Sequence, residues 1–162
     1  MTAPEITVRP HRDTDVPVLV DVIRAAFAEY RGRLDPPSSA ERKSPEVVRA
    51  ELADGGALVA EHGATVVGCV FWHPRDDGIY LDRLAVLPPW RGHGVGRRLV
   101  DAVEALARDA GAHHVSLSVR LALERQRAWY ASLGYGFLSE GTHPGYDRPT
   151  NVTLRKPLAP ST

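Results

Sequence analysis

The chain has 162 residues, which suits one domain over residues 1–162, and 43% of them are hydrophobic, enough for a buried core. Lysine plus arginine balances aspartate plus glutamate at 20 each, with both signs mixed along the chain, so we expect no nucleic-acid partner and no charged scaffold role. No stretch reaches the ~18 apolar residues of a membrane helix, and the opening residues lack the features of a signal peptide, so we expect a cytoplasmic protein without membrane contact.

The first half of the chain predicts a strand, two helices and three further strands. Apolar residues recur at helical spacing from Val16 to Phe27, behind the helix-capping side chains of Asp13-Thr14-Asp15. Ser44-Pro45 is typical of a helix start, and the turn sequences at 62–64 and 76–78 each predict an antiparallel hairpin. The expected elements are a strand at 6–9, helices ending near residues 28 and 52, and strands at 57–61, 65–72 and 79–87.

The second half predicts a long helix, a strand, a short helix and two closing strands. The long helix follows a glycine-rich turn and carries an apolar stripe that includes Val95, Leu99 and Ala110. The strand at 114–119 is connected through this helix, so it should run parallel to the strand before the helix. A helix at 124–133 and strands at 135–139 and 151–154 complete a mixed α/β fold with about four helices and a mostly antiparallel sheet.

The strongest motif is the segment Arg91-Gly92-His93-Gly94-Val95-Gly96, called here the glycine loop. Its glycines let the backbone approach a ligand closely, and the free N–H groups of the following helix start favour an anion, so the loop predicts a pyrophosphate site. Leu99 stands where a dinucleotide fingerprint needs its third glycine, and the Gly-Lys-Ser/Thr ending of a P-loop is absent from the sequence.

Cysteine and histidine chemistry is not indicated. Cys69 is the only cysteine and lies in an apolar run, which predicts a small buried side chain rather than a nucleophile. The seven histidines are scattered, and the adjacent His113-His114 should face opposite sides of a strand. We therefore expect no metal site.

The glycine loop, placed after a strand ending at residues 84–88, resembles the acetyl-CoA-binding motif of the GNAT-type N-acetyltransferase superfamily. Two more segments support the resemblance. The segment from Tyr130 to Tyr135 is similar to the family's Tyr-x-x-x-Gly-Phe helix ending, with Tyr135 where phenylalanine is commoner. The opening Val8-Arg9-Pro10 resembles its first strand and turn. The resemblance covers residues 6–154 and leaves the individual member unidentified.

The resemblance implies acetyl-CoA as the acyl donor. Backbone groups of the strand would bind the pantetheine arm, and the N–H groups of the glycine loop would hold the pyrophosphate, with Arg91 adding charge. Gln126 stands where many relatives have asparagine, and its longer side chain leaves open whether the amide role persists. The implied cofactor-binding residues are Leu84, Ala85, Val86, Arg91, Gly92, His93, Gly94, Val95, Gly96, Arg97, Gln126 and Tyr130.

For catalysis, the resemblance implies that the phenol of Tyr130 protonates the departing thiolate. A base for the amine is harder to assign. Asp82 is the leading candidate, acting through a water, and Glu29 and His73 are weaker ones.

The implied reaction is direct acetyl transfer to the amine of a small molecule. The acceptor would lie between residues 29–43, Trp72-His73, Tyr80 and the loop at 143–147 that contains Tyr146. A non-catalytic acyl-CoA-binding sensor and a peptide or protein N-acetyltransferase remain alternatives. The resemblance also leaves a homodimer open, because dimers are common in the family. The acceptor-side residues are Glu29, Trp72, His73, Tyr80 and Tyr146.

Overall fold

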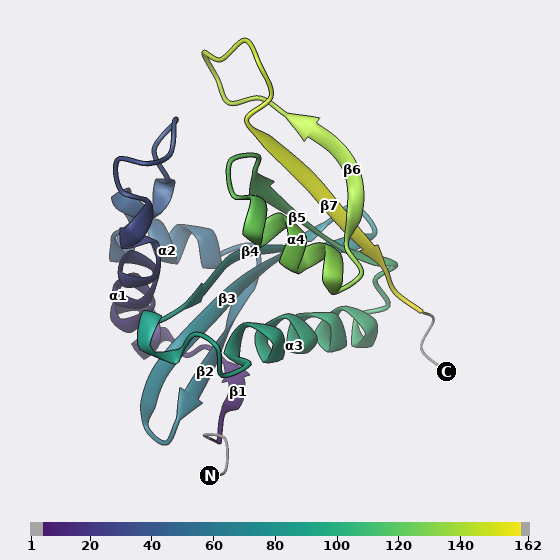
Figure 1. Cartoon of the computed structure of the whole chain (residues 1–162). Coiled ribbons are helices and arrows are strands. Elements are labelled where there is room, and N and C mark those ends of the chain that lie inside the picture. Colours follow the sequence, from purple (N-terminus) through teal and green to yellow (C-terminus); the bar gives the residue numbers. More distant parts are fainter. Residues whose placement is uncertain (1–4, 160–162) are drawn as a thin grey trace. The chain divides into compact units, whose positions relative to one another are not determined.

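The computed structural model describes residues 5–159, in which helices alternate with the strands of a seven-stranded sheet (Figure 1). The strands are hydrogen-bonded in the order β1-β2-β3-β4-β5-β7-β6. This confirms the mixed α/β fold. The strands are β1 (Thr7–Pro10), β2 (Gly56–His62), β3 (Thr65–Arg75), β4 (Gly78–Val86), β5 (His114–Arg120), β6 (Gly136–Gly141) and β7 (Asn151–Pro157).

Four α-helices and several short 3-10 turns connect these strands. The helices are α1 (Val16–Phe27), α2 (Pro45–Leu52), α3 (Val95–Asp109) and α4 (Glu124–Ser132), and the 3-10 turns are η1 (Asp13–Asp15), η2 (Ala28–Tyr30), η3 (Ser39–Arg42) and η4 (Pro88–Trp90). Within residues 5–159, no helix combines the length and apolar character needed to cross a bilayer. The prediction about a signal peptide concerns residues 1–4, which lie outside the described part of the chain.

Strand pairing agrees with the predicted connections. β1 and β2 pair antiparallel, as do β2 and β3. β4 and β5 pair parallel through Ile79 with Val115, as expected for strands joined by α3. β7 then pairs antiparallel with both β5 and β6.

The chain divides into two compact units, and the divisions fall inside continuous elements. The first unit comprises the described residues up to His73 together with Leu81–Ala105, and the second comprises Pro74–Tyr80 and the described residues from Leu106 onward. The divisions therefore cut β3, β4 and α3.

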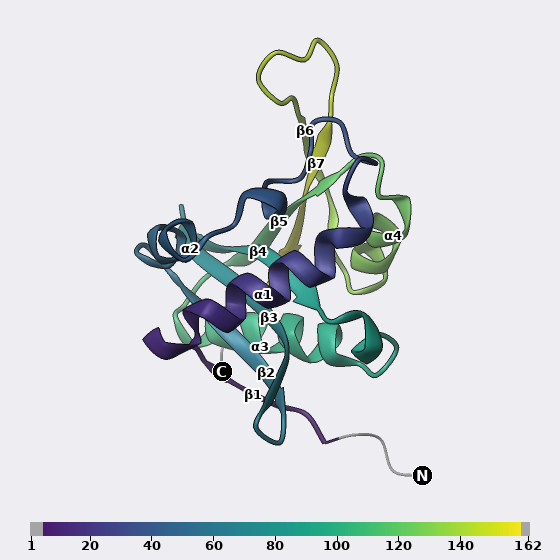
Figure 2. The ribbon, with the colours of Figure 1, turned by 90° about the vertical axis from the view of Figure 1, so that its left-hand side faces the viewer.

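In the first unit, helices cover both faces of β2 and β3. Figure 2 shows α1 crossing one face, with α3 behind the strands. On the α1 face, a core cluster joins residues of α1 and α2 to alternate residues of the two strands, including Val59 and Phe71. On the other face, a Cβ at Gly68 would lie 3.1 Å from Val95 and 3.3 Å from Leu99, so the glycine lets α3 pack closely.

Two details of the helices differ from the sequence prediction. Asp15 precedes α1, but its carboxylate makes no capping bond to that helix and instead accepts from the Arg12 N–H and from Arg9. Along α3, Val100 and Ala107 are buried, whereas Ala110 is exposed because the helix ends at Asp109. The Ser44-Pro45 prediction is confirmed, because the Ser44 hydroxyl accepts from the Val47 N–H at 3.2 Å.

Two buried features stabilise the first unit. Arg9 lies between Asp15 and Glu61, with shortest nitrogen–oxygen distances of 2.8 and 2.7 Å, so it ties β1 to the start of α1 and to β2. Cys69 is fully buried in the core cluster, and this burial raises the pKa of its thiol to about 12. The prediction of a small, buried cysteine is confirmed.

The second unit is built on β5, β7 and β6, with α4 alongside. Tyr130 of α4 is buried, and its ring lies 5.0 Å from that of Trp129 and 5.9 Å from that of Tyr135. In the β3–β4 hairpin, the Arg75 guanidinium stacks 3.9 Å from the centre of the Tyr80 ring.

Candidate active site

The glycine loop joins η4 to the first turn of α3. Gly92 and Gly94 have φ angles of +80° and +79°, a conformation that side chains other than glycine rarely adopt. No heavy atom lies within 4 Å of the position that a Cβ would take at either residue. The first helical hydrogen bond runs from the Arg98 N–H to the Gly94 carbonyl at 3.1 Å, and the N–H groups of a helix start have no acceptor within their own helix. Open space beside these backbone donors suits a diphosphate.

The arginines near the loop have protein partners. Arg91 places one guanidinium nitrogen 2.6 Å from the Glu29 carboxylate and donates from another to the Ala26 carbonyl at 2.8 Å. Both partners lie at the C-terminal end of α1 or just after it. Arg97 faces Asp101 at 3.2 Å on the exposed surface of α3. The structure therefore places Arg91 between the glycine loop and the end of α1.

The strand before the loop contains a backbone irregularity. Arg83 has a φ of +51°, a left-handed conformation that costs a non-glycine residue roughly 1–2 kcal/mol. Its N–H donates to the Asp82 carboxylate at 3.0 Å, which supports this local turn. The segment predicted to bind pantetheine follows directly: Ala85 is buried, and Leu84 and Val86 are half-buried.

Asp82 and His73, two of the sequence-predicted residues, lie together in the first unit with a third group, Asp54. The Nε2 atom of His73 lies 3.7 Å from Asp82 Oδ2, and its Nδ1 atom lies 3.1 Å from Asp54 Oδ1. Asp54 comes from the turn between α2 and β2. Sequence reasoning missed this residue because Asp54-Gly55-Gly56 was a sufficient signal for a turn and gave no sign of a partner on β3.

The charges in this cluster shift both pKa values. The hydrogen bond to Asp82 raises the pKa of His73, helped by the charges of both carboxylates and opposed by burial. Burial alone would raise the pKa of Asp82, but the His73 hydrogen bond and the positive charges of Arg83, His73 and Lys43 outweigh it and hold that pKa below its usual value.

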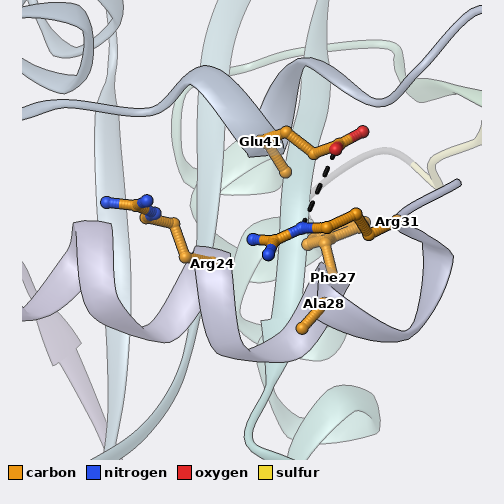
Figure 3. Close-up of a pocket in the computed structure, with 6 residues that line it drawn as sticks. Arg24, Phe27, Ala28, Arg31 and Glu41 are labelled. Atoms are coloured by element: carbon orange, nitrogen blue, oxygen red, sulfur yellow. Dashed lines mark ion pairs between the residues drawn. The ribbon is translucent and has the colours of Figure 1, made fainter.

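Residues 29–43, predicted to line the acceptor region, contain a basic surface and a buried lysine. Figure 3 shows a small hollow beside α1, with Arg31 facing Glu41 of η3 at 3.9 Å. The side chain of Lys43 is 2% exposed and pairs with Glu51 of α2. Burial lowers the pKa of Lys43 to about 8. The hollow is lined by Arg24, Phe27, Ala28, Arg31, Ala40 and Glu41.

The remaining predicted residues differ in their settings. Trp72 is half-buried, and a Cβ at Gly56 would lie 2.9 Å from its indole ring, so it packs against the start of β2. Tyr130, Gln126, Tyr80 and Tyr146 belong to the second unit, where Gln126 and Tyr146 are half-buried. Among residues 5–159, no group of three or more histidine, cysteine or acidic side chains is arranged to hold a metal ion.

Comparison with known proteins identifies the family. The Acetyltransferase (GNAT) family matches residues 20–135. A curated relative, the IAA acetyltransferase of Azospirillum brasilense, is 34% identical over 110 residues, which cover 62% of this chain and 67% of the relative.

Solved structures agree on the fold. The ribosomal-protein-S18-alanine N-acetyltransferase of Escherichia coli aligns with a TM-score of 0.78 at 18% identity, covering 98% of this chain and 97% of that one. The PaiA N-acetyltransferase of Thermoplasma acidophilum, in complex with coenzyme A, aligns with a TM-score of 0.77 at 19% identity, covering 94% and 99%. The family match spans most of the chain, including the glycine loop and Tyr130, and the chain therefore belongs to the GNAT family of acetyltransferases.

Proposed function

We propose that the chain transfers an acetyl group directly from acetyl-CoA to the amine of a small molecule, as one acetyltransferase domain. The observation that carries this proposal is the glycine loop: two left-handed glycines open onto free space at the start of α3 in a member of an acetyltransferase family. The name of the curated relative, IAA acetyltransferase, supports acetyl transfer as the reaction.

The chain's own residues have distinct tasks in this proposal. Acetyl-CoA supplies the acetyl group as a thioester when bound. N–H groups of the glycine loop hold its diphosphate, and the backbone of Leu84, Ala85 and Val86 holds the pantetheine arm. Tyr130 donates a proton to the leaving sulfur, because a phenol with a pKa near ~10 keeps its proton at neutral pH.

The acceptor side favours a cationic substrate over an anionic one. Asp82 stays ionised, since its pKa lies below the usual value, and its side chain is 34% exposed. A carboxylate that is both charged and accessible attracts an ammonium group. We therefore propose a primary or secondary amine as the acceptor.

Calorimetry with coenzyme A, followed by a free-thiol release assay over a panel of small amines, tests the proposal. We expect binding, and thiol release with at least one amine. Binding without thiol release for every amine would favour a non-catalytic sensor, and release only with peptides would favour a protein acetyltransferase.

Replacing Tyr130 with Phe tests the assigned acid. The substitution removes one hydroxyl and keeps the ring that packs against Trp129 and Tyr135. We expect the maximal rate to fall by roughly 10²-fold or more, with little change in coenzyme A affinity. An unchanged maximal rate would remove Tyr130 from the mechanism.

A further inference from the structure

His73 is held between two carboxylates that come from different elements. Near the end of β3, its Nδ1 faces Asp54 at 3.1 Å and its Nε2 faces Asp82 of β4 at 3.7 Å. The first distance is that of a hydrogen bond, and the second is too long for a strong one. The imidazole is therefore oriented through Nδ1, and Nε2 faces a gap beside a carboxylate.

The backbone places Asp54 beside the imidazole. A Cβ at Gly55 would lie 2.0 Å from the Trp72 carbonyl oxygen and 3.0 Å from His73 Nδ1, so only glycine fits there. This close approach of the α2–β2 turn to β3 makes the Asp54–His73 contact possible.

Exposure changes in steps across the cluster. The side chain of His73 is 13% exposed, that of Asp82 is 34% exposed and that of Asp54 is 79% exposed. A proton on the imidazole is therefore one hydrogen bond away from a carboxylate in bulk solvent.

Other charged groups act on the Asp82 side of the cluster. Arg83 follows Asp82 on β4, and Lys43 before α2 contributes positive charge to it, although Lys43 also pairs with Glu51. These cations keep Asp82 ionised. His73 is therefore the member whose protonation changes closest to neutral pH, since its pKa is raised from an ordinary value near 6.5.

We propose that His73 is the general base of the amine acetylation proposed above, with Asp54 as its positioning residue and Asp82 as the ammonium-binding group. This assignment rests on that proposed function. In neutral His73 the ring proton lies on Nδ1 and is donated to Asp54, which leaves a lone pair on Nε2. A substrate ammonium in the gap donates one N–H to Asp82 and another to Nε2.

The proton transfer balances without any other reactant. The ammonium N–H bond breaks, a new N–H bond forms at Nε2, and the electron pair stays on the amine nitrogen for attack. The resulting imidazolium has a carboxylate at each nitrogen, which stabilises it. After turnover, the proton leaves to solvent on the side of Asp54.

The first test needs no turnover. NMR titration of histidine-labelled protein gives the pKa of His73, whose signal is assigned by its loss in His73→Gln. We expect that pKa to fall in Asp54→Asn and in Asp82→Asn and to stay unchanged in Asp109→Asn, an exposed control on α3. A His73 pKa that is the same in all of these proteins would overturn the proposal.

The second test follows kcat/KM against pH with an active amine. We expect His73→Gln to lose about 10²- to 10⁴-fold in kcat/KM with unchanged coenzyme A affinity, and the exposed control His113→Gln to keep full activity. Because Asp54 raises the pKa of His73, Asp54→Asn should shift the acidic limb of the profile to lower pH.

The outcomes separate the base from the reaction. If wild-type protein turns over and His73→Gln keeps both its rate and its acidic limb, the base assignment fails and the proposed function stands. If wild-type protein binds coenzyme A but acetylates no amine, the proposed function fails and the base assignment fails with it.

Discussion

At the scale of single residues, Arg91 links the glycine loop to the segment predicted to contact the acceptor. Its guanidinium contacts the Glu29 carboxylate and the Ala26 carbonyl, both near the end of α1. The arginine and the glutamate are 43% and 45% exposed, so their ion pair contributes little to stability, on the order of 0–1 kcal/mol. The pair matters more for where the positive charge of Arg91 is spent.

Replacing Glu29 with Gln should raise the affinity for coenzyme A. Glu29 competes with the diphosphate for the charge of Arg91, and removing a partly exposed ion pair releases up to ~1 kcal/mol, or roughly fivefold in affinity. Calorimetry with coenzyme A alone measures the change. Arg91→Ala is the matched variant and should weaken binding; equal affinities in all three proteins would contradict a contact between Arg91 and the phosphates.

Asp15 should make stability depend on acid pH. The Arg9 hydrogen bond, assisted by the Arg12 N–H, lowers the pKa of Asp15 to about 2. Since the unfolded chain has a value near ~3.9, the ionised carboxylate stabilises the fold above about pH 4 by roughly 2–3 kcal/mol, and this contribution is lost as pH falls toward 2. Urea unfolding from pH 7 to pH 2 measures it. Asp15→Asn should be less stable at pH 7 and flatter between pH 4 and 2, whereas parallel curves would contradict the assignment.

At the scale of elements, the glycine loop and the β2–β3 turn use the same backbone device for different ends. Gly94 of the loop has a φ of +79° and Gly63 of the turn has a φ of +60°, and a Cβ at either residue would meet open space. The cost of a side chain at these positions is therefore conformational, not steric. Only the loop precedes a long helix, so only there should this conformation govern binding.

Gly94→Ala should weaken coenzyme A binding, and Gly63→Ala should not. Each substitution costs about 1–2 kcal/mol of stability, because alanine is strained at positive φ. In the glycine loop the same strain turns donor N–H groups away from the diphosphate, so we expect at least roughly tenfold weaker binding. Chemical unfolding and calorimetry of both variants make the comparison. Equal losses of affinity would show that binding responds to stability alone.

At the scale of the whole molecule, the two compact units share three continuous elements. The divisions after His73, Tyr80 and Ala105 interrupt β3, β4 and α3 without ending them. A strand or helix that continues across a division carries its hydrogen bonds from one unit into the other. Loss of structure in one unit therefore removes support from the other.

We accordingly expect one cooperative unfolding transition. Trp72 and Trp90 belong to the first unit and Trp129 belongs to the second, so tryptophan fluorescence can follow each unit separately. A variant with Trp129→Phe and a variant with Trp72→Phe and Trp90→Phe should unfold at the same urea concentration by fluorescence as by circular dichroism, after allowance for the stability that each substitution removes. Two separated transitions within one variant would contradict this coupling.

The fold was largely predictable, because periodicity and turn residues are local signals. The strands, the four helices and the parallel crossover follow from apolar spacing, caps and glycines within short windows of sequence. The contact of Asp54 with His73 was not predictable, since it depends on a turn and a strand 19 residues apart meeting where only glycine fits. The same applies to Arg91, whose hydrogen-bond partner Ala26 lies 65 residues earlier.

The position of Cys69 has a practical consequence for every experiment above. The only sulfhydryl of the chain is sealed in the core and resists ionisation, so folded protein should be silent toward disulfide reagents. Colour developed by such a reagent during turnover then counts released coenzyme alone. In protein without substrate, the same reagent becomes a clock for opening of the core, because Cys69 can be labelled only when the surrounding side chains part.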